Sequence, residues 1–255
     1  MNEQNTSIYI CTHIGFNNND FNNKIYKVIT NHPEIENKSN LELITTCDTY
    51  SDRLWGELTN HRHVWENIEE KSDFIGFCHY RRFFSFMNDL PENAELVFPE
   101  PILQPYNNVA MYNIYHNADD LIQAANIVNT KFPQYKNAVI AMMDSHSIIP
   151  YNSFVMTKEL FDEYCTFLFG VLDGLMTIRG IENDPRLGIK YIEDHKEKYL
   201  KNYYPNDQVD YQLRIMFGGV GERLSTAFFM YCMKEKGIDP LITKMNVVEH
   251  TYNTI

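Results

Sequence analysis

A nearly continuous apolar run occupies residues 73–80 and ends in polar side chains. Strands that are buried on both faces have this composition, because other layers cover both sides of a parallel sheet. In open α/β sheets, ligands bind beyond the carboxyl ends of the strands. The run therefore predicts a central strand whose carboxyl end opens onto a binding site.

Strands and helices alternate along much of the chain, which predicts an α/β fold. β-Branched and aromatic residues indicate strands at 7–13, 41–47 and 153–156 and an edge strand at 247–248. Apolar residues at helical spacing predict helices at 53–69, 121–132, 158–176 and 222–236. Asn117 or Asp119 is the expected N-cap of the second helix.

Three segments are expected to lack regular structure. Residues 85–115 contain four prolines and are predicted to be irregular. Residues 177–210 are charged and rich in tyrosine, and we expect them to form an excursion from the fold. The glycines at 218, 219 and 221 are expected to break the chain before the last helix.

The composition limits the classes of ligand. A chain of 255 residues is long enough for one large domain or two small ones. Its net charge of −12 argues against a general nucleic-acid binder, which would carry a basic surface. An anionic ligand must therefore be held by a local cluster of basic residues.

The cysteines indicate a reduced protein. There are five, an odd number, and no two have the spacing of a CxxC motif. Four of them stand in apolar runs, so we expect buried thiols in a cytoplasmic protein. The start of the chain lacks the basic and apolar segments of a signal peptide, and no apolar stretch approaches the length of a transmembrane helix.

His79-Tyr80-Arg81-Arg82 is the sharpest local signal. It follows the predicted central strand directly, and the planar donor fork of arginine suits phosphate oxygens. In an acidic protein this cluster is a candidate clamp for a diphosphate. The alternative is that one arginine is solvated and the other pairs with a nearby carboxylate, and the spacing alone does not decide between the two.

Carboxylates at three other places are weaker candidates. Asp48 and Asp52 flank a loop after the second predicted strand, where they would reach a ribose or a metal, but turn and helix-cap roles suit them better. Glu222, followed by Arg223, is a candidate general base or sugar-binding carboxylate. The alternative for Glu222 is a helix first turn, which favours an acidic residue in any case.

No metal or nucleophile motif stands out. His61 and His63 are two residues apart on a predicted helix and do not face one ligand, so a core or surface role is favoured over a metal site. Asp144 and His146 fall in a predicted loop and form a weak candidate. The sequence has no zinc-ligand spacing, no Gly-x-Ser-x-Gly motif and no phosphate-binding glycine loop.

Taken in order, these segments resemble the DUF4422 family of glycosyltransferases of bacterial polysaccharide biosynthesis. The most specific match is the Glu-Leu-Thr segment at 57–59 followed by the His-Tyr-Arg-Arg segment at 79–82. The matching stretches span nearly the whole chain and occupy residues 9–13, 48–52, 57–59, 65–67, 76–84, 151–152, 159–165 and 221–224.

The resemblance implies a single GT-A-like, Rossmann-like α/β domain with a mixed central sheet flanked by helices. Its nucleotide-binding part would span about 1–90 and its acceptor-side part about 91–255. By the same resemblance, several residues would bind the nucleotide or the donor sugar. These are Thr12, His13, Asp48, Asp52, Tyr80, Asn152 and Arg223, although a buried turn-capping role suits Asn152 equally well.

Two hypotheses about the mechanism go beyond what the resemblance implies. Where most GT-A enzymes carry a metal-binding Asp-x-Asp motif, this chain has His79, Arg81 and Arg82, so we expect basic side chains to stabilise the departing diphosphate without an essential magnesium or manganese ion. Glu222 is the first candidate for the base, with Asp144 and Asp48 behind it. Whether the transfer inverts or retains the anomeric configuration stays open.

The implied reaction transfers a sugar, with galactose in pyranose or furanose form as our expectation, from a UDP-sugar to a glycan or lipid-linked acceptor. Capsule, O-antigen or exopolysaccharide synthesis would be the setting, in the cytoplasm with peripheral contact to the inner membrane. Phe83, Phe84, Phe86 and Met87 would assist that contact, but core packing is favoured for them. The alternatives are a non-catalytic nucleotide-sugar-binding module and, less well supported, a phosphoesterase.

Overall fold

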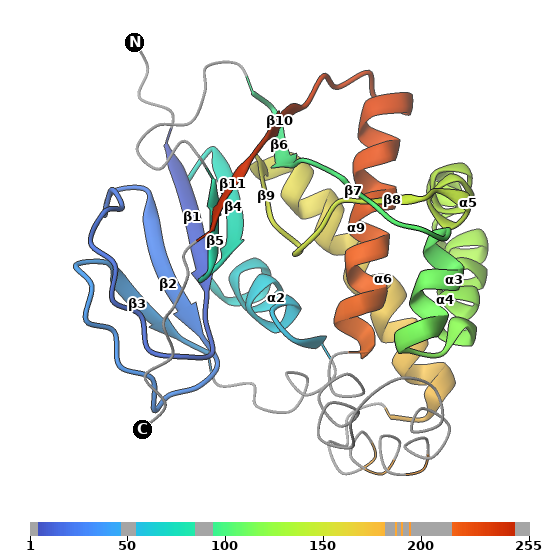
Figure 1. Cartoon of the computed structure of the whole chain (residues 1–255), viewed down its shortest axis with the longest axis horizontal. Helices are drawn as coiled ribbons and strands as arrows, with labels where there is room; N and C mark the ends of the chain where they lie inside the picture. Colours follow the sequence, from blue (N-terminus) through green and yellow to red (C-terminus); the bar gives the residue numbers. More distant parts are fainter. Residues whose placement is uncertain are drawn as a thin grey trace.

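The computed structural model describes residues 5–46, 55–84, 94–181, 187, 190, 194 and 216–247. A nine-stranded sheet lies at the centre of this part, with seven strands in the order β10-β6-β9-β4-β1-β2-β3 (Figure 1). The first four strands along the chain run parallel to one another: β1 (Thr6–Cys11), β2 (Tyr26–Thr30), β3 (Glu42–Thr45) and β4 (Phe74–His79).

The predicted central strand is confirmed as β4. Residues 75–78 are fully buried, and β4 pairs with β1 on one side and β9 on the other. Gly76 is needed there because an added Cβ would lie 2.7 Å from Val155 Cγ2 and 2.9 Å from the Phe154 carbonyl oxygen. The strand is therefore packed on both faces, as its apolar run requires.

The other half of the sheet is mixed in direction. β9 (Phe154–Thr157) runs antiparallel to β4 and to β6 (Leu96–Pro99), and β10 (Leu241–Thr243) is parallel to β6. β5 (Arg82–Phe84) folds back on the end of β4 and pairs with β11 (Met245–Val247). The turn before β9 consequently lies beside the carboxyl end of β4.

Helices cover one face of the sheet (Figure 1). Side chains of α2 (Leu58–Asn67), α6 (Lys158–Arg179) and α9 (Met216–Glu235) share a core with this face. An outer layer packs on these helices and comprises α3 (Asn108–Tyr115), α4 (Ala118–Lys131), α5 (Lys136–Asp144), the 3₁₀ turn Pro133–Tyr135 and the small sheet of β7 (Ile102–Leu103) and β8 (Ser147–Ile148). The α/β class with a mixed central sheet is thus confirmed.

The opposite face of the sheet has a smaller core. Phe16 and Phe21 from the segment after β1 pack there with Phe83 and Phe84 of β5. Phe83 and Phe84 are 1% and 0% exposed, which confirms core packing over a role at a membrane; Phe86 and Met87 lie outside the described residues. Within the described part of the chain, no helix has the length and apolarity to cross a membrane.

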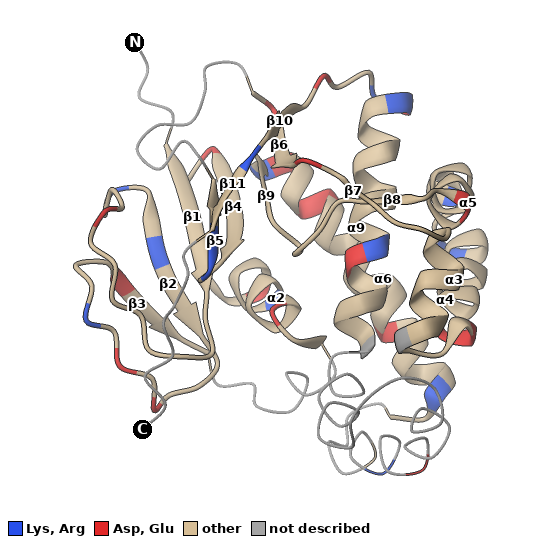
Figure 2. Cartoon of the chain, viewed as in Figure 1, with Lys and Arg blue, Asp and Glu red and all other residues tan. Residues whose placement is uncertain are grey.

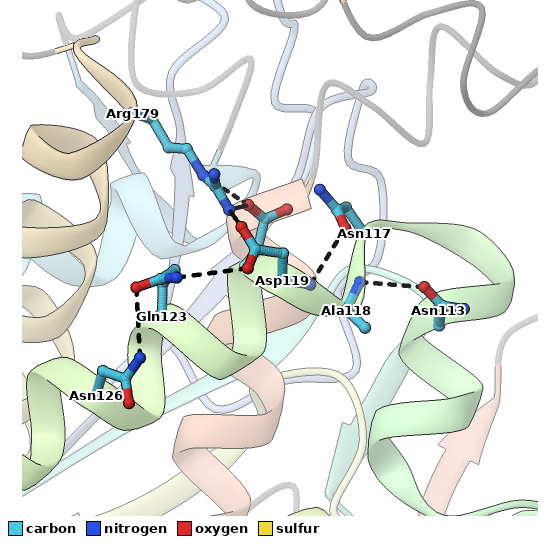
Figure 3. Close-up of polar contacts among 8 residues, drawn as sticks. Asn113, Asn117, Ala118, Asp119, Gln123, Asn126 and Arg179 are labelled. Carbon is cyan, nitrogen blue, oxygen red and sulfur yellow. Dashed lines mark hydrogen bonds and ion pairs between the residues drawn. The ribbon is translucent and has the colours of Figure 1, made fainter.

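Helix α4 begins as predicted and is tied to α6 by ion pairs. The Asn117 side chain accepts the Asp119 backbone N–H and caps the helix. The Arg179 guanidinium from the end of α6 binds Asp119 Oδ2 at 2.7 Å and Asp120 Oδ1 at 2.6 Å (Figure 3). Because Asp120 is fully buried, its charge requires this partner.

Two predictions of irregular structure are wrong. Residues 94–115 contain β6, β7 and α3, and the Asn107 side chain caps α3 by accepting the Ala110 N–H. The glycines at 218, 219 and 221 lie inside α9 and do not interrupt it. They permit close helix packing, because a Cβ on Gly221 would overlap Leu58 Cδ1 of α2 and one on Gly219 would lie 3.1 Å from His116 Nε2.

Buried groups agree with the core predictions. Cys11, Cys78, Cys165 and Cys232 are buried free thiols, and Cys47 lies outside the described residues. His61 is fully buried, with its ring stacked 3.9 Å from that of Phe77, which confirms a core role. Neither of its ring nitrogens has a hydrogen-bond partner among the described residues. Burial lowers the pKa of His61 to about 3.

We expect His61→Leu to make the protein more stable in acid. His61 must stay neutral in the fold but gains a proton near pH 6.5 when unfolded, so stability falls as the pH drops from about 6.5 towards 3. At pH 5 this costs about 2 kcal/mol. Urea unfolding at pH 7.5 and pH 5 measures the difference, and His63→Leu on the same helix is the control. An unchanged pH dependence in His61→Leu would contradict the prediction.

Candidate functional site

The carboxyl ends of β1 and β4 lie side by side and carry the predicted polar residues. Cys11 is opposite His79 in the register, and the Tyr80 backbone N–H donates to the Cys11 carbonyl at 3.0 Å. Thr12 and His13 therefore emerge beside the segment 79–82. The Thr12 side chain is buried and donates to the Ile14 carbonyl, which shapes the turn, whereas His13 is exposed.

His13, His79 and Tyr80 form an aromatic cluster at this edge. The His79 and Tyr80 rings lie 4.2 Å apart between centroids, and the His13 and Tyr80 rings meet edge-on at 5.0 Å. The Tyr80 hydroxyl is 3.5 Å from His13 Nε2. The sequence-predicted residues after the two strands are thus brought together.

His79 is a neutral donor in the free protein. Burial, followed by the charges of Arg81, the His13 ring and Arg82, lowers the pKa of His79 to about 3. Its Nδ1 accepts the Arg81 backbone N–H at 3.3 Å, so the proton of the neutral ring resides on Nε2. The expectation that His79 adds positive charge to the cluster is therefore wrong, and the charge comes from the two arginines.

Arg81 and Arg82 are half-buried and rest on aromatic rings. The Arg81 guanidinium carbon lies 5.1 Å from the Tyr80 ring centroid, and that of Arg82 lies 4.2 Å from the Tyr151 ring centroid. Arg82 belongs to β5, which stands out in blue in Figure 2. Stacking on an aromatic ring orients the guanidinium plane, and the edge of such a plane is suited to binding an anion.

Glu222 reaches the same region from α9. Its Oε1 accepts the Tyr151 backbone N–H at 2.5 Å, and burial raises the pKa of its carboxyl while Arg223 and this hydrogen bond oppose the shift. Glu222 is the seventh residue of α9, so the expectation that it opens a helix is wrong. A partly buried carboxylate with a raised pKa is a better proton acceptor than an exposed one.

Arg223 follows Glu222 in α9, where a red and blue band lies midway along the helix (Figure 2), but its side-chain contacts are with α3 and α9. Arg223 is 6% exposed, and its guanidinium donates to the backbone carbonyls of Asn108 and Gly219. It also lies 4.9 Å from the Tyr112 ring centroid. These contacts join α3 to α9 and give Arg223 a packing role in the free protein.

Asn152 lies in the turn before β9 and joins two helices. Its Nδ2 donates to Glu57 Oε1 at 2.9 Å, and its Oδ1 accepts from Ser225 Oγ at 3.2 Å. Glu57 and Ser225 were not singled out as site residues in the sequence. The one available signal was the position of Glu57 in the segment 57–59, directly before α2.

The structure does not show the remaining candidates in this cluster. Asp48 and Asp52 lie outside the described residues. Asp144 and His146 are exposed at the end of α5, and His61 is in the core. Among the described residues, no group of three or more histidine, cysteine, aspartate or glutamate side chains is placed to hold a metal ion.

Residues 7–186 match the model of the DUF4422 family, which is described as a domain of unknown function. The chain belongs to this family. Among solved structures, this DUF4422 chain is similar to the apo structure of WbbM, described as a bifunctional glycosyltransferase, with a TM-score of 0.71 and 22% identity. The similarity covers 96% of the DUF4422 chain but 45% of WbbM, so it establishes a shared fold. No curated protein matches the sequence.

Proposed function

We propose that this DUF4422 chain is a glycosyltransferase that moves a sugar from a UDP-sugar to a glycan acceptor in bacterial surface polysaccharide synthesis. One observation carries the proposal: Arg81, Arg82 and the neutral donor His79 all lie at the carboxyl end of β4. The fold shared with part of a bifunctional glycosyltransferase supports it.

The arginines would bind the diphosphate of the donor. As the bond from the anomeric carbon to the phosphate oxygen breaks, negative charge develops on the diphosphate, and fixed cationic donors stabilise that charge. The side chains at this strand end are a poor set of metal ligands, because two are cationic and the Nδ1 of His79 is engaged. We therefore assign the role of the metal in GT-A-like enzymes to Arg81 and Arg82.

Glu222 would accept the proton of the acceptor hydroxyl if the transfer inverts the anomeric centre. Its Oε1 is bound to the Tyr151 N–H, which leaves Oε2 to accept the proton. If the configuration is retained, the same carboxylate would orient the donor sugar. In either case it acts from the side of the site formed by α9.

The nucleotide would lie over the ends of β1 and β4, where Thr12, His13 and Tyr80 are gathered. Asp48 and Asp52 are proposed for the base or ribose on the resemblance alone. Galactose, in pyranose or furanose form, is the proposed sugar. A lipid-linked acceptor at the cytoplasmic face of the inner membrane is the proposed setting.

A non-catalytic nucleotide-sugar-binding module is the second candidate. The observation that favours it is the engagement of Glu222 with the Tyr151 backbone, because a carboxylate that only supports a turn needs no proton-transfer role. Binding of UDP with neither hydrolysis nor transfer of the sugar would identify this function.

A screen of nucleotide sugars by thermal unfolding tests the proposal. We expect UDP-sugars to raise the unfolding temperature by about 5–10 °C at 100 times their dissociation constant, because they bind the folded state alone. GDP- and CMP-sugars serve as controls at the same concentrations. Consumption of the donor is then measured as the release of UDP. The proposal is rejected if no nucleotide sugar binds.

A further inference from the structure

The turn before β9 has an unusual backbone. Tyr151 and Asn152 have φ angles of 70° and 46°, and they are the only non-glycine residues with positive φ in the described part of the chain. Asparagine tolerates this region, whereas a bulky residue such as tyrosine rarely adopts it. Strained residues of this kind persist where their surroundings hold them, and they cluster at functional sites.

Two carboxylates, one in α9 and one directly before α2, hold the turn. Glu222 of α9 accepts the Tyr151 backbone N–H at 2.5 Å, and Glu57, directly before α2, accepts Asn152 Nδ2 at 2.9 Å. Asn152 is 3% exposed, so its side-chain amide requires hydrogen-bond partners. A carboxylate can only accept a hydrogen bond, so the Nδ2 donor of the Asn152 amide must face Glu57. The Oδ1 acceptor then faces Ser225, whose hydroxyl donates to it.

The turn also places an aromatic ring against the Arg82 guanidinium. Phe77 of β4 is opposite Phe154 of β9, so the segment before β9 runs beside the end of β4. The Tyr151 ring lies 4.2 Å from the Arg82 guanidinium carbon. A continuous line of contacts therefore leads from Glu57 through Asn152 and Tyr151 to Arg82.

We propose that Glu57 is a positioning residue: its carboxylate holds the Tyr151–Asn152 turn so that Tyr151 keeps the Arg82 guanidinium aimed at the donor diphosphate. The inference rests on the proposed function. It assigns Glu57 no contact with the substrate, and its effect on transfer passes through Arg82.

A double-mutant cycle tests this role. Glu57→Ala should lower kcat/KM for UDP release from UDP-galactose by about 10- to 100-fold, since a small misplacement of a binding group is costly. In an Arg82→Ala background the same substitution should change kcat/KM by less than about twofold, because coupled residues are not additive. Glu57→Gln should restore most of the activity, since its amide oxygen still accepts from Asn152 Nδ2.

The controls separate positioning from folding. Glu66→Ala removes a charge from α2, the helix that follows Glu57, at an exposed ion pair with Arg62, and should leave activity unchanged. If Glu57→Ala fails to fold, Asn152→Asp replaces it, because the aspartate tolerates the backbone but repels Glu57 and should reproduce the loss. If Glu57→Ala lowers kcat/KM equally in the wild-type and Arg82→Ala backgrounds, the inference is overturned. Full activity of both Glu57→Ala and Asn152→Asp would overturn it as well. Neither result would reject the proposed function. Wild-type protein that neither binds UDP nor releases it from any donor would reject the proposed function and the inference with it.

Discussion

Arg82→Ala should lower the turnover of the donor by about 10²- to 10³-fold, as expected for the loss of one preorganised donor to a developing negative charge. The loss should appear mainly in kcat, because the diphosphate gains most of its charge as the sugar departs. Arg82→Lys should recover only part of it, since an ammonium group lacks the planar fork and stacks less well on Tyr151. Steady-state kinetics of UDP release measure these values.

Two controls make the Arg82 prediction specific. Lys38→Ala removes a positive charge from an exposed ion pair with Glu36 and should leave turnover unchanged. Wild-type turnover should also be unchanged in excess EDTA if, as proposed, the arginines and not a metal ion stabilise the diphosphate. A complete loss of turnover in EDTA that manganese restores would contradict this account of the site.

The sequence predicted the elements that build the site better than those around it. The apolar run at 73–80 predicts β4, and the helical spacing after Lys158 predicts α6, because a continuous apolar run and a long helical pattern each leave few alternatives. β2 was missed, although Tyr26, Val28 and Ile29 are typical strand residues. The segment is only five residues long, and such short runs are ambiguous without their neighbours.

The glycines of α9 show why local propensity failed. Glycine is a poor helix former, so three of them within four residues predict a break. Tertiary packing reverses this preference, since the missing Cβ atoms let α9 approach Leu58 of α2 and His116 after α3. Which helices meet is not encoded near residue 219, and the sequence alone could not reveal the reason for the glycines.

The site was predictable only where its residues are adjacent in the chain. The segment 79–82 was found because a strand end and two arginines are local features. The contact of Glu57 with Asn152 joins residues 95 positions apart, and that of Glu222 with Tyr151 joins residues 71 apart. The neutral state of His79 also depends on burial and neighbouring charges, which no local pattern reports.

Glu222→Gln should lower turnover by about 10²- to 10⁴-fold if Glu222 is the general base. The glutamine oxygen still accepts the Tyr151 N–H, so the turn and the Arg82 stacking are kept while proton acceptance is lost. In the wild type, protonation of Glu222 removes the base, and because burial raises its pKa, turnover should fall on the acid side at a pH above the ordinary glutamate value of about 4.3. The pH dependence of kcat measures this limb.

The unfolding temperature of Glu222→Gln tests whether a loss of turnover comes from loss of the fold. A raised pKa means that the fold disfavours the charged form of Glu222, so the neutral glutamine should unfold at the same or a higher temperature at pH 7.5. Glu222→Ala removes both the base and the acceptor for Tyr151, and it should lose turnover together with the coupling between Glu57 and Arg82. Near-normal turnover by folded Glu222→Gln would assign the carboxylate to the turn alone and leave proton acceptance to another group.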